Sequence, residues 1–191
     1  MIVNVINLPH RKDRLKHFIN ESKEQQFQYK VWDGIIDNIP ATGISKAFKQ
    51  IVKWAKDNNL PCVCIAEDDI KFCDKGAWNF YIKNIPTEYD LYLGSIYCGD
   101  LDNGIVNWFS GFTLVTIHER FYDKFLSTNE KNHIDRQMVL HKGMYKVCYP
   151  FAAIQLDGYS DNVGKVTNYN KKYLADRELF NSTKHSLQPL L

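Results

Sequence analysis

The sequence predicts an α/β protein, a single domain built on a central, mostly parallel (mixed) sheet that is flanked by helices. Apolar strand-like segments alternate with amphipathic segments along the chain, as they do in doubly wound sheets. Residues 62–66 form a continuous apolar run, which is typical of a strand buried on both faces of a parallel sheet. With 191 residues, of which 45% are hydrophobic and 24% charged, the chain is long enough for one soluble core.

The beginning of the chain predicts a strand, a helix and a second strand. Residues 2–7 are apolar and rich in β-branched side chains, and Pro9 ends this strand. The charged stretch 11–26 carries apolar side chains at helical spacing. Residues 27–32 alternate between apolar and polar side chains, which predicts a strand that ends at the following Asp-Gly pair.

The middle of the chain repeats this alternation. Residues 44–55 carry apolar side chains at steps of three and four, which predicts a one-sided amphipathic helix. The buried strand over 62–66 follows at once. A short helix is then expected over 76–85, ended by Pro86, and a further strand over 89–96.

The later sequence is richer in β-forming residues. It predicts a strand over 111–116, helices over 119–126 and 135–141, and one or two strands within 145–155. We expect the folded domain to cover residues 1–167 and the polar segment 168–191 to form a loosely held tail. The lysines noted in this tail are Lys171, Lys172 and Lys184.

The bulk composition argues against a general affinity for nucleic acid or membranes. The 24 basic and 22 acidic side chains leave a formal net charge of +2. The apolar start of the chain is far too short for a signal sequence or a transmembrane segment. The five cysteines are odd in number and lack Cys-x-x-Cys spacing, which fits a reducing cytoplasm. Cys62 and Cys64 lie inside the apolar run and are expected to be packing residues. The oligomeric state is left open.

Three consecutive acids, Glu67, Asp68 and Asp69, follow the buried strand. The carboxyl edge of an open α/β sheet is where such folds place their ligands. Carboxylate oxygens suit hard divalent cations, and such cations in turn hold diphosphates. A metal–diphosphate site is therefore predicted here. The alternative is that Glu67 and Asp68 cap the next segment and are solvated.

Two other patterns imitate metal sites. Asp100 and Asp102 form a literal D-x-D, but an Asn-Gly pair follows, which favours a polar hairpin turn. His133 and His141 are eight residues apart and would share a helical face, but no third ligand is evident in the sequence. Neither pattern is interpreted as a metal site.

Four stretches of the chain together resemble the glycosyltransferase family 25 group. Residues 6–14 match its opening strand and N-L-x-x-R-x-x-R pattern, and 43–69 match its central helix, strand and acidic block. Residues 110–114 match a glycine-led strand, and 134–136 match a short late element containing Asp. The resemblance covers about residues 2–161. It implies a GT-A fold and the transfer of a sugar from a nucleotide-sugar donor.

The resemblance also implies roles for particular residues. It places Asp69 on a divalent metal (Mn²⁺ or Mg²⁺), with Glu67 as a second ligand, or Glu67 and Asp68 beside the ribose or a metal-bound water. Asp135 becomes the general base, with Asp157 and Asp161 as fallback candidates. The nucleotide-binding candidates are Asn7, Leu8, Arg11 and Arg14. Guanidinium groups form a planar fork that suits phosphate, although basic residues on a helix are more often a solvated face.

The chain also departs from the family pattern. The family's Ser-His pair is replaced by Ser45-Lys46, and Asn162 follows Ser160-Asp161. The expected reaction is inverting transfer from a UDP-sugar to a hydroxyl acceptor, either a glycan such as lipooligosaccharide or a hydroxylated DNA base. The alternatives are a non-catalytic binding module and a nucleotidyltransferase, although the latter's glycine-rich phosphate loop is not seen.

Overall fold

The computed structural model describes residues 1–169 and 177–185. Within them, eight strands form one sheet in the order β2-β1-β3-β8-β5-β9-β7-β6. Their bounds are β1 Val3–Asn7, β2 Tyr29–Asp33, β3 Cys62–Glu67, β5 Leu91–Leu93, β6 Cys98–Asp102, β7 Ile105–Ser110, β8 Leu114–His118 and β9 Tyr145–Val147. The strand pairings make six of these strands run in one direction, with β7 and β8 opposed. The expected α/β architecture with a mostly parallel, mixed sheet is confirmed.

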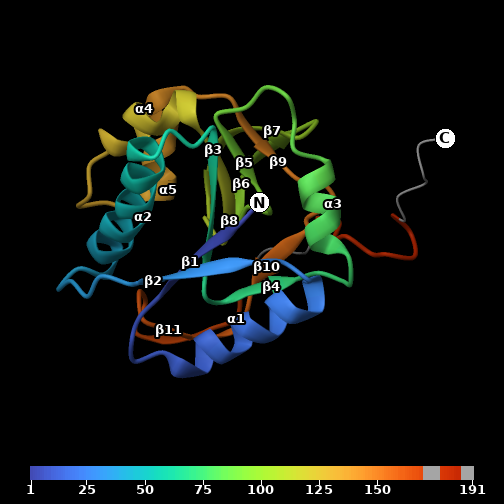
Figure 1. Ribbon diagram of the computed structural model, residues 1–191, viewed down its shortest axis with the longest axis horizontal. Helices are drawn as coiled ribbons and strands as arrows, with labels where there is room; N and C mark the ends of the chain where they lie inside the picture. Colours follow the sequence, from blue (N-terminus) through green and yellow to red (C-terminus); the bar gives the residue numbers. More distant parts are fainter. Residues whose placement is uncertain (170–176, 186–191) are drawn as a thin grey trace.

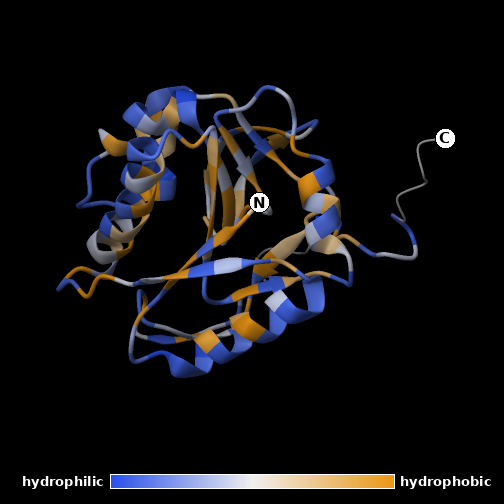
Figure 2. Cartoon of the chain, viewed as in Figure 1, coloured by the Kyte–Doolittle hydropathy of each residue, from blue (hydrophilic) through white to orange (hydrophobic). Residues whose placement is uncertain are grey.

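Helices cover both faces of this sheet (Figure 1). One side carries α2 Pro40–Asp57, α4 Tyr122–Leu126 and α5 Ile134–Gln137, and the other carries α1 Lys12–Gln25 and α3 Ala77–Lys83. The buried strand β3 explains the two layers, because its side chains alternate between two cores. Val63 and Ile65 pack with α2, whereas Cys64 and Ala66 pack with α1 and α3. Figure 2 shows the apolar strands between helices with hydrophilic outer faces.

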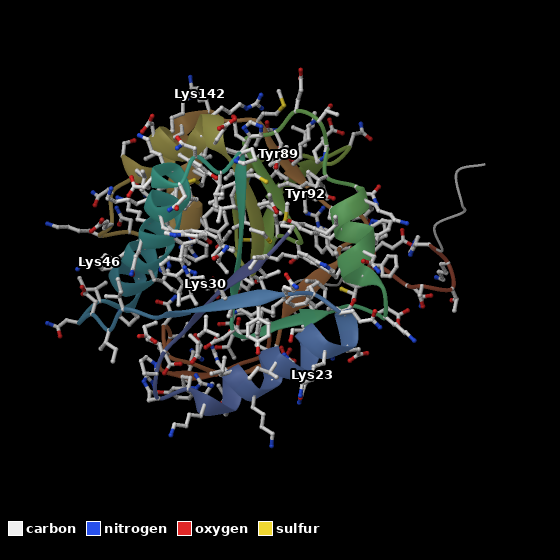
Figure 3. The ribbon with its side chains drawn as sticks, in the orientation of Figure 1. Lys23, Lys30, Lys46, Tyr89, Tyr92 and Lys142 are labelled. Carbon is white, nitrogen blue, oxygen red and sulfur yellow. The ribbon has the colours of Figure 1, made fainter. Side chains whose placement is uncertain are left out.

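Shorter elements complete the fold. The strands β4 Ile70–Phe72 and β10 Ala153–Gln155 pair antiparallel, and so do β11 Gly158–Ser160 and β12 Lys165–Thr167. The 3-10 turns η1 Glu119–Phe121 and η2 Met138–His141 flank α4 and α5. Figure 3 shows Lys23, Lys46 and Lys142 at the periphery of the molecule, as expected for solvated charges.

Several strands differ from the sequence-based expectation. The chain after the acids turns into β4, whereas no strand was expected there. The strand expected over 111–116 is β8 and starts at Leu114, because Gly111 adopts a φ of +113° that interrupts an extended strand. The Asn-Gly turn is confirmed: Asn103 and Gly104 have φ values of 47° and 78° and join β6 to β7. These two strands were missed, because polar residues interrupt their apolar pattern.

The C-terminal segment is not loose throughout. Residues 177–185 lie against the domain, with Phe180 5% exposed and its ring 4.6 Å from that of Phe80. The backbone N–H and hydroxyl of Ser182 both donate to Asp74 at 2.7 Å. The sequence did not indicate this contact, because the segment is mostly polar and Phe180 is its one buried aromatic residue within 177–185. Lys171 and Lys172 lie outside the described residues.

Among the described residues, no helix is both long and apolar enough to span a membrane. All five cysteines fall within the described ranges, and none of them forms a disulfide there. Cys64 and Cys148 are buried, and burial raises the pKa of each thiol to about 12. These two thiols are therefore packing groups, which is the role that the sequence predicted for Cys64.

Candidate active site

A cavity of about 350 Å³ lies beyond the carboxyl ends of β1 and β3. It is bounded on one side by the acidic turn after β3 and on the other by α2 and α5. The residues of its wall that were expected from the sequence to be functional are Leu8, Arg14, Glu67, Asp68, Asp69, Asp135 and the fallback candidate Asp161, whereas Asp157 does not line it. Asn7 and Arg11 do not line it. The expected position, the carboxyl edge of the sheet, is where the cavity lies.

The acidic turn is fixed by its neighbours. Glu67 is the last residue of β3, and Asp68 and Asp69 turn the chain into β4. Because β4 pairs with β10, the residue opposite Ile70 is Gln155, and the N–H of Leu156 donates to the carbonyl oxygen of Asp69 at 2.7 Å. Asp68 and Asp69 are 5% and 2% exposed, so both carboxylates need partners inside the protein.

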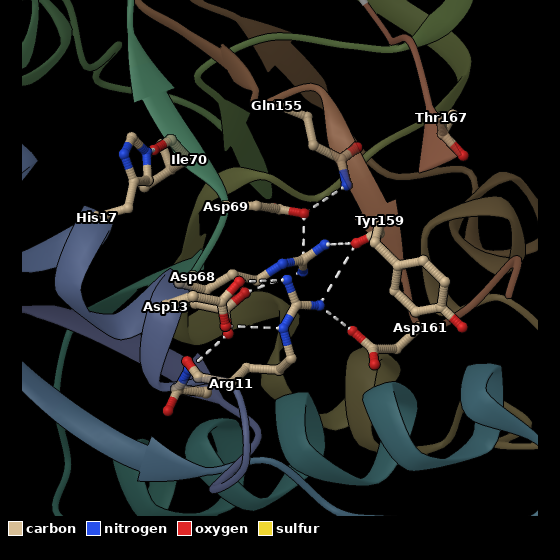
Figure 4. Close-up of polar contacts among 12 residues, drawn as sticks. Arg11, Asp13, His17, Asp68, Asp69, Ile70, Gln155, Tyr159, Asp161 and Thr167 are labelled. Carbon is tan, nitrogen blue, oxygen red and sulfur yellow. Dashed lines mark hydrogen bonds and ion pairs between the residues drawn. The ribbon is translucent and has the colours of Figure 1, made fainter. Parts of the chain in front are cut away.

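The two oxygens of Asp69 have different surroundings. Its Oδ2 accepts a hydrogen bond from Gln155 Nε2 at 2.9 Å and lies 3.0 Å from the guanidinium of Arg14 (Figure 4). Its Oδ1 is buried and has no hydrogen-bond partner among the described residues. Burial raises the pKa of Asp69, and the positive charge of Arg14 opposes that rise. An unpartnered buried carboxylate oxygen fits the approach of a cation.

Asp68 is satisfied on both oxygens. Its Oδ2 accepts from Asn7 Nδ2 at 2.7 Å, and its Oδ1 accepts from the guanidinium of Arg14 at 3.1 Å. Burial and the nearby charge of Asp69 raise its pKa to about 6. Asn7 therefore acts on the site through Asp68, since its own side chain lies behind the cavity wall.

The two arginines at the start of α1 have separate surroundings. Arg14 reaches the acidic turn, whereas Arg11 pairs with Asp13 at 2.9 Å and with Asp161. Both guanidinium groups also donate to the carbonyl oxygen of Tyr159, at 2.7 Å from Arg14 and 3.4 Å from Arg11. The spacing of the two arginines did not distinguish them, because Asp68, Asp69 and Asp161, which separate their surroundings, lie far from α1 in the sequence.

Glu67 and Asp135 complete the acidic lining. Burial raises the pKa of Glu67 well above its usual value, with the charges of Asp69 and Asp135 adding to the rise. Asp135 Oδ2 accepts from Ser110 Oγ at 2.8 Å and from the N–H of Gly111 at 2.6 Å. Asp135 lies inside α5, whose N-cap is His133. Asp135 is therefore not the N-cap of this helix.

Sequence reasoning missed two residues of this site. Gln155 holds Asp69 only because β10 pairs with β4, and no local signal announces that pairing. Ser110 belongs to a stretch that resembled the family pattern, but its bond to Asp135 joins two distant segments. Covariation between these positions in related sequences is the signal that would have found them.

Neither the Asp100–Asp102 pair nor the His133–His141 pair lines the cavity with both of its side chains. Asp100 and Asp102 lie in the β6–β7 hairpin, where Asp100 accepts from Asn107 at 3.2 Å. His133 lines the cavity, but Nε2 of His141 lies 3.2 Å from the Thr128 hydroxyl. Across residues 1–169 and 177–185, no group of three His, Cys, Asp or Glu side chains is arranged to hold a metal ion.

Comparisons with known proteins bear on the fold alone. No family model matches the chain, and no curated protein matches its sequence. The chain is similar in structure to A197 from STIV, with a TM-score of 0.51, 13% identity, and coverage of 87% of this chain and 97% of that one. At this identity the likeness shows a shared fold and no activity.

Two glycosyltransferases are also similar to it. One is involved in glycosylation of the major capsid of PBCV-1, with a TM-score of 0.49, 8% identity, and coverage of 76% and 80% of the two chains. The other is a variant of Drosophila β1,4-galactosyltransferase 7 in complex with manganese, UDP-Gal and xylobiose, with a TM-score of 0.49, 10% identity, and coverage of 98% and 79%. Membership of glycosyltransferase family 25 stays a prediction.

Proposed function

We propose that this protein is a metal-dependent glycosyltransferase of the GT-A type that uses a nucleotide-sugar donor, with a UDP-sugar favoured. The observation that carries the proposal is the cavity at the carboxyl edge of the sheet, which combines a buried acidic turn with a separate carboxylate, Asp135, contributed by α5. Such a site offers a place for a diphosphate and its cation on one side and a base on the other. The sequence resemblance to glycosyltransferase family 25 supports the same reaction.

Asp69 and Glu67 are the residues that would hold a divalent cation, Mn²⁺ or Mg²⁺. The unpartnered Oδ1 of Asp69, within the described part of the chain, and the crowding of like charges around Glu67 both favour a cation there. When bound, the cation would supply positive charge to the diphosphate that leaves the sugar. Asp68 would stay fixed by the hydrogen bond from Asn7.

The donor would lie along the wall formed by Leu8 and Arg14. Leu8 packs closely on Gly34, where an added Cβ would come within 2.9 Å of the leucine side chain. Leu8 and Gly34 are therefore in close contact at the wall where we place the nucleotide. Arg14 presents a guanidinium group to the cavity, and such groups bind phosphate oxygens in a planar fork. Arg11 is assigned to the support of this wall.

Asp135 is the proposed general base. An inverting transfer requires a group that takes the proton of the acceptor hydroxyl as it attacks the sugar. Ser110 and the N–H of Gly111 both donate to Oδ2 of Asp135, which fixes the carboxylate at the cavity wall. This arrangement favours a base that is held in one orientation before the acceptor binds.

A glycan is the acceptor that we favour. The wall contributed by α2 is largely apolar, with Pro40, Ile44 and Phe48, and sugar rings pack well on apolar surfaces. A hydroxylated DNA base would need basic residues around the cavity. Of the tail lysines, Lys184 is exposed but does not line the cavity. We place the reaction in the cytoplasm, where free cysteines are stable.

The proposal is tested by incubating the protein with a panel of nucleotide-sugars and Mn²⁺ and measuring the release of nucleoside diphosphate. We expect slow release from one donor class, UDP-sugars, even without an acceptor, and faster release when a glycan acceptor is added. Asp135→Asn should remove the acceptor-dependent part. If a folded sample binds UDP but releases nothing from any donor, the protein is a binding module and the proposed activity is wrong.

A further inference from the structure

The β11–β12 hairpin forms one side of the cavity but is not part of the central sheet. Its two strands pair only with each other among the described residues, and such hairpins are marginally stable alone. Ser160 and Asp161 line the cavity, whereas Val166 on the outer strand is 76% exposed. Contacts with the rest of the domain must therefore hold the hairpin in place.

The guanidinium groups of Arg11 and Arg14, at the start of α1, provide several of these contacts. Arg11 and Arg14 both donate to the carbonyl oxygen of Tyr159, and Arg11 also pairs with Asp161. His10 Nε2 lies 3.5 Å from the same Asp161 carboxylate. Figure 4 shows the side chain of Arg11 directed toward Tyr159 and Asp161. The hairpin is thus docked on the helix start by charge-assisted hydrogen bonds.

Arg14 has a second set of partners at the acidic turn. The nitrogen that faces Asp68 and Asp69 lies 3.1 Å and 3.0 Å from their carboxylates, and the other terminal nitrogen donates to Tyr159. One partly buried side chain therefore neutralises the acid pair and anchors the hairpin. Any ligand that takes over the first task changes the energetics of the second.

We infer that Arg14 is a resident counter-ion of the acidic turn, and that a divalent cation bound at Asp69 competes with it and loosens the β11–β12 hairpin. The inference rests on the cation site of the proposed function. A divalent charge beside Asp68 and Asp69 repels the guanidinium at close range, because both charges would share one pair of carboxylates. The attraction that keeps Arg14 between the acids and Tyr159 is then weakened. By linkage, Arg14 lowers the affinity of the site for the cation.

The first measurement is Mn²⁺ affinity, obtained from the free-ion signal in electron paramagnetic resonance. Arg14→Gln removes the competing charge, so we expect it to bind Mn²⁺ about tenfold more tightly than the wild type. Arg14→Lys keeps the charge and should bind close to the wild-type level, which guards against a Gln variant that folds poorly. Equal or weaker Mn²⁺ binding by a folded Arg14→Gln protein overturns the inference.

The second measurement is hydrogen exchange of residues 158–167 with and without Mn²⁺. In the wild type we expect Mn²⁺ to speed exchange in this hairpin, and in Arg14→Gln we expect fast exchange that Mn²⁺ leaves unchanged. Arg11→Gln is the matched control, because Arg11 holds the hairpin without contacting Asp68 or Asp69. It should speed hairpin exchange and leave Mn²⁺ affinity within about twofold of the wild type.

The outcomes separate this inference from the proposed function. Slower or unchanged hairpin exchange with Mn²⁺ overturns the coupling, and UDP-sugar turnover by the wild type would still stand. If the wild type neither binds Mn²⁺ nor turns over a donor while Arg14→Gln does bind Mn²⁺, the counter-ion role is supported and the proposed activity is not. If neither protein binds Mn²⁺, the cation site and the inference both fall.

Discussion

The guanidinium of Arg14 lies 3.0 Å from one oxygen of Asp69, while the other oxygen of Asp69 has no partner within the described residues. The two oxygens of one buried carboxylate thus differ: Gln155 and Arg14 fix the first, and the second remains available. A partly satisfied buried network is costly in an ordinary core. It is favourable where a ligand completes the network, as a cation bound at Asp69 would.

Asp68 should make stability depend on pH between about 4 and 6. Its folded-state pKa of about 6 lies above the ordinary 3.8, so the folded protein binds this proton more tightly than the unfolded chain does. The resulting stabilisation is present at low pH and is lost as the pH rises through about 6. Two pKa units correspond to roughly 3 kcal/mol as an upper bound.

This dependence is measured by urea unfolding of the wild type and Asp68→Asn at pH 4 and pH 7. The free energy of unfolding of the wild type, relative to the variant, should fall by about 2–3 kcal/mol between the two pH values. A difference that does not change with pH would mean that the carboxylate titrates normally in the folded protein.

Asp135→Asn should lower kcat by about 10²–10⁴-fold, because an amide cannot take the acceptor proton. UDP affinity should change little, since the carboxylate of Asp135 is held by Ser110 and Gly111 and not by the acidic turn. Ser110→Ala should lower kcat less, through a less fixed Asp135. Ser127→Ala, whose hydroxyl bonds only locally to Lys124, is the control and should keep wild-type kinetics. Full activity of Asp135→Asn would assign the base elsewhere.

Gly43→Ala should destabilise the protein although alanine favours helices. An added Cβ would lie 2.1 Å from the carbonyl oxygen of Ile35, and the backbone there cannot yield easily. Such overpacking costs about 1–3 kcal/mol, which exceeds the gain of about 1 kcal/mol in helix propensity. Thermal unfolding measures the net effect. The control is Lys53→Ala on the exposed face of α2, which should change the free energy of unfolding by about 0.5 kcal/mol or less. A Gly43→Ala protein that is more stable than the wild type would contradict the close approach of Gly43 to Ile35.

Phe180→Ala should cost about 3–5 kcal/mol of stability, as expected for truncating a buried aromatic side chain. The ring packs on Phe80 of α3 and is almost fully buried. Chemical denaturation gives the value, and Lys184→Ala in the same segment should be neutral. If Phe180→Ala leaves the free energy of unfolding unchanged, the segment is loosely held, as the sequence predicted.

The sequence predicted the layers of this fold because its pattern is local. The buried run before Glu67 and the one-sided helix that contains Phe48 are visible without any tertiary information, and both formed as expected. The strand β4 was missed because Ile70–Phe72 is too short to show a period. Its existence depends on pairing with β10, more than 80 residues later in the chain.

The site was predictable only where one segment carried the signal. The acids after β3 were identified from their position at the end of a predicted strand, and Asp135 from the resemblance to glycosyltransferase family 25. Gln155 and the partners of Arg11 were not, because strand pairing and the β11–β12 hairpin bring them there. The sequence and the family resemblance together therefore indicated charged residues that line the cavity, but not the contacts that orient them.

Calorimetric titration with UDP, in the presence and absence of Mn²⁺, tests most directly whether the acidic turn is a metal–diphosphate site. We expect the wild type to bind UDP only when Mn²⁺ is present, and Asp69→Asn, which keeps the size of the side chain, to bind it in neither condition. UDP binding that is equally strong without Mn²⁺ or in Asp69→Asn, or no binding by the folded wild type, would contradict the central proposal.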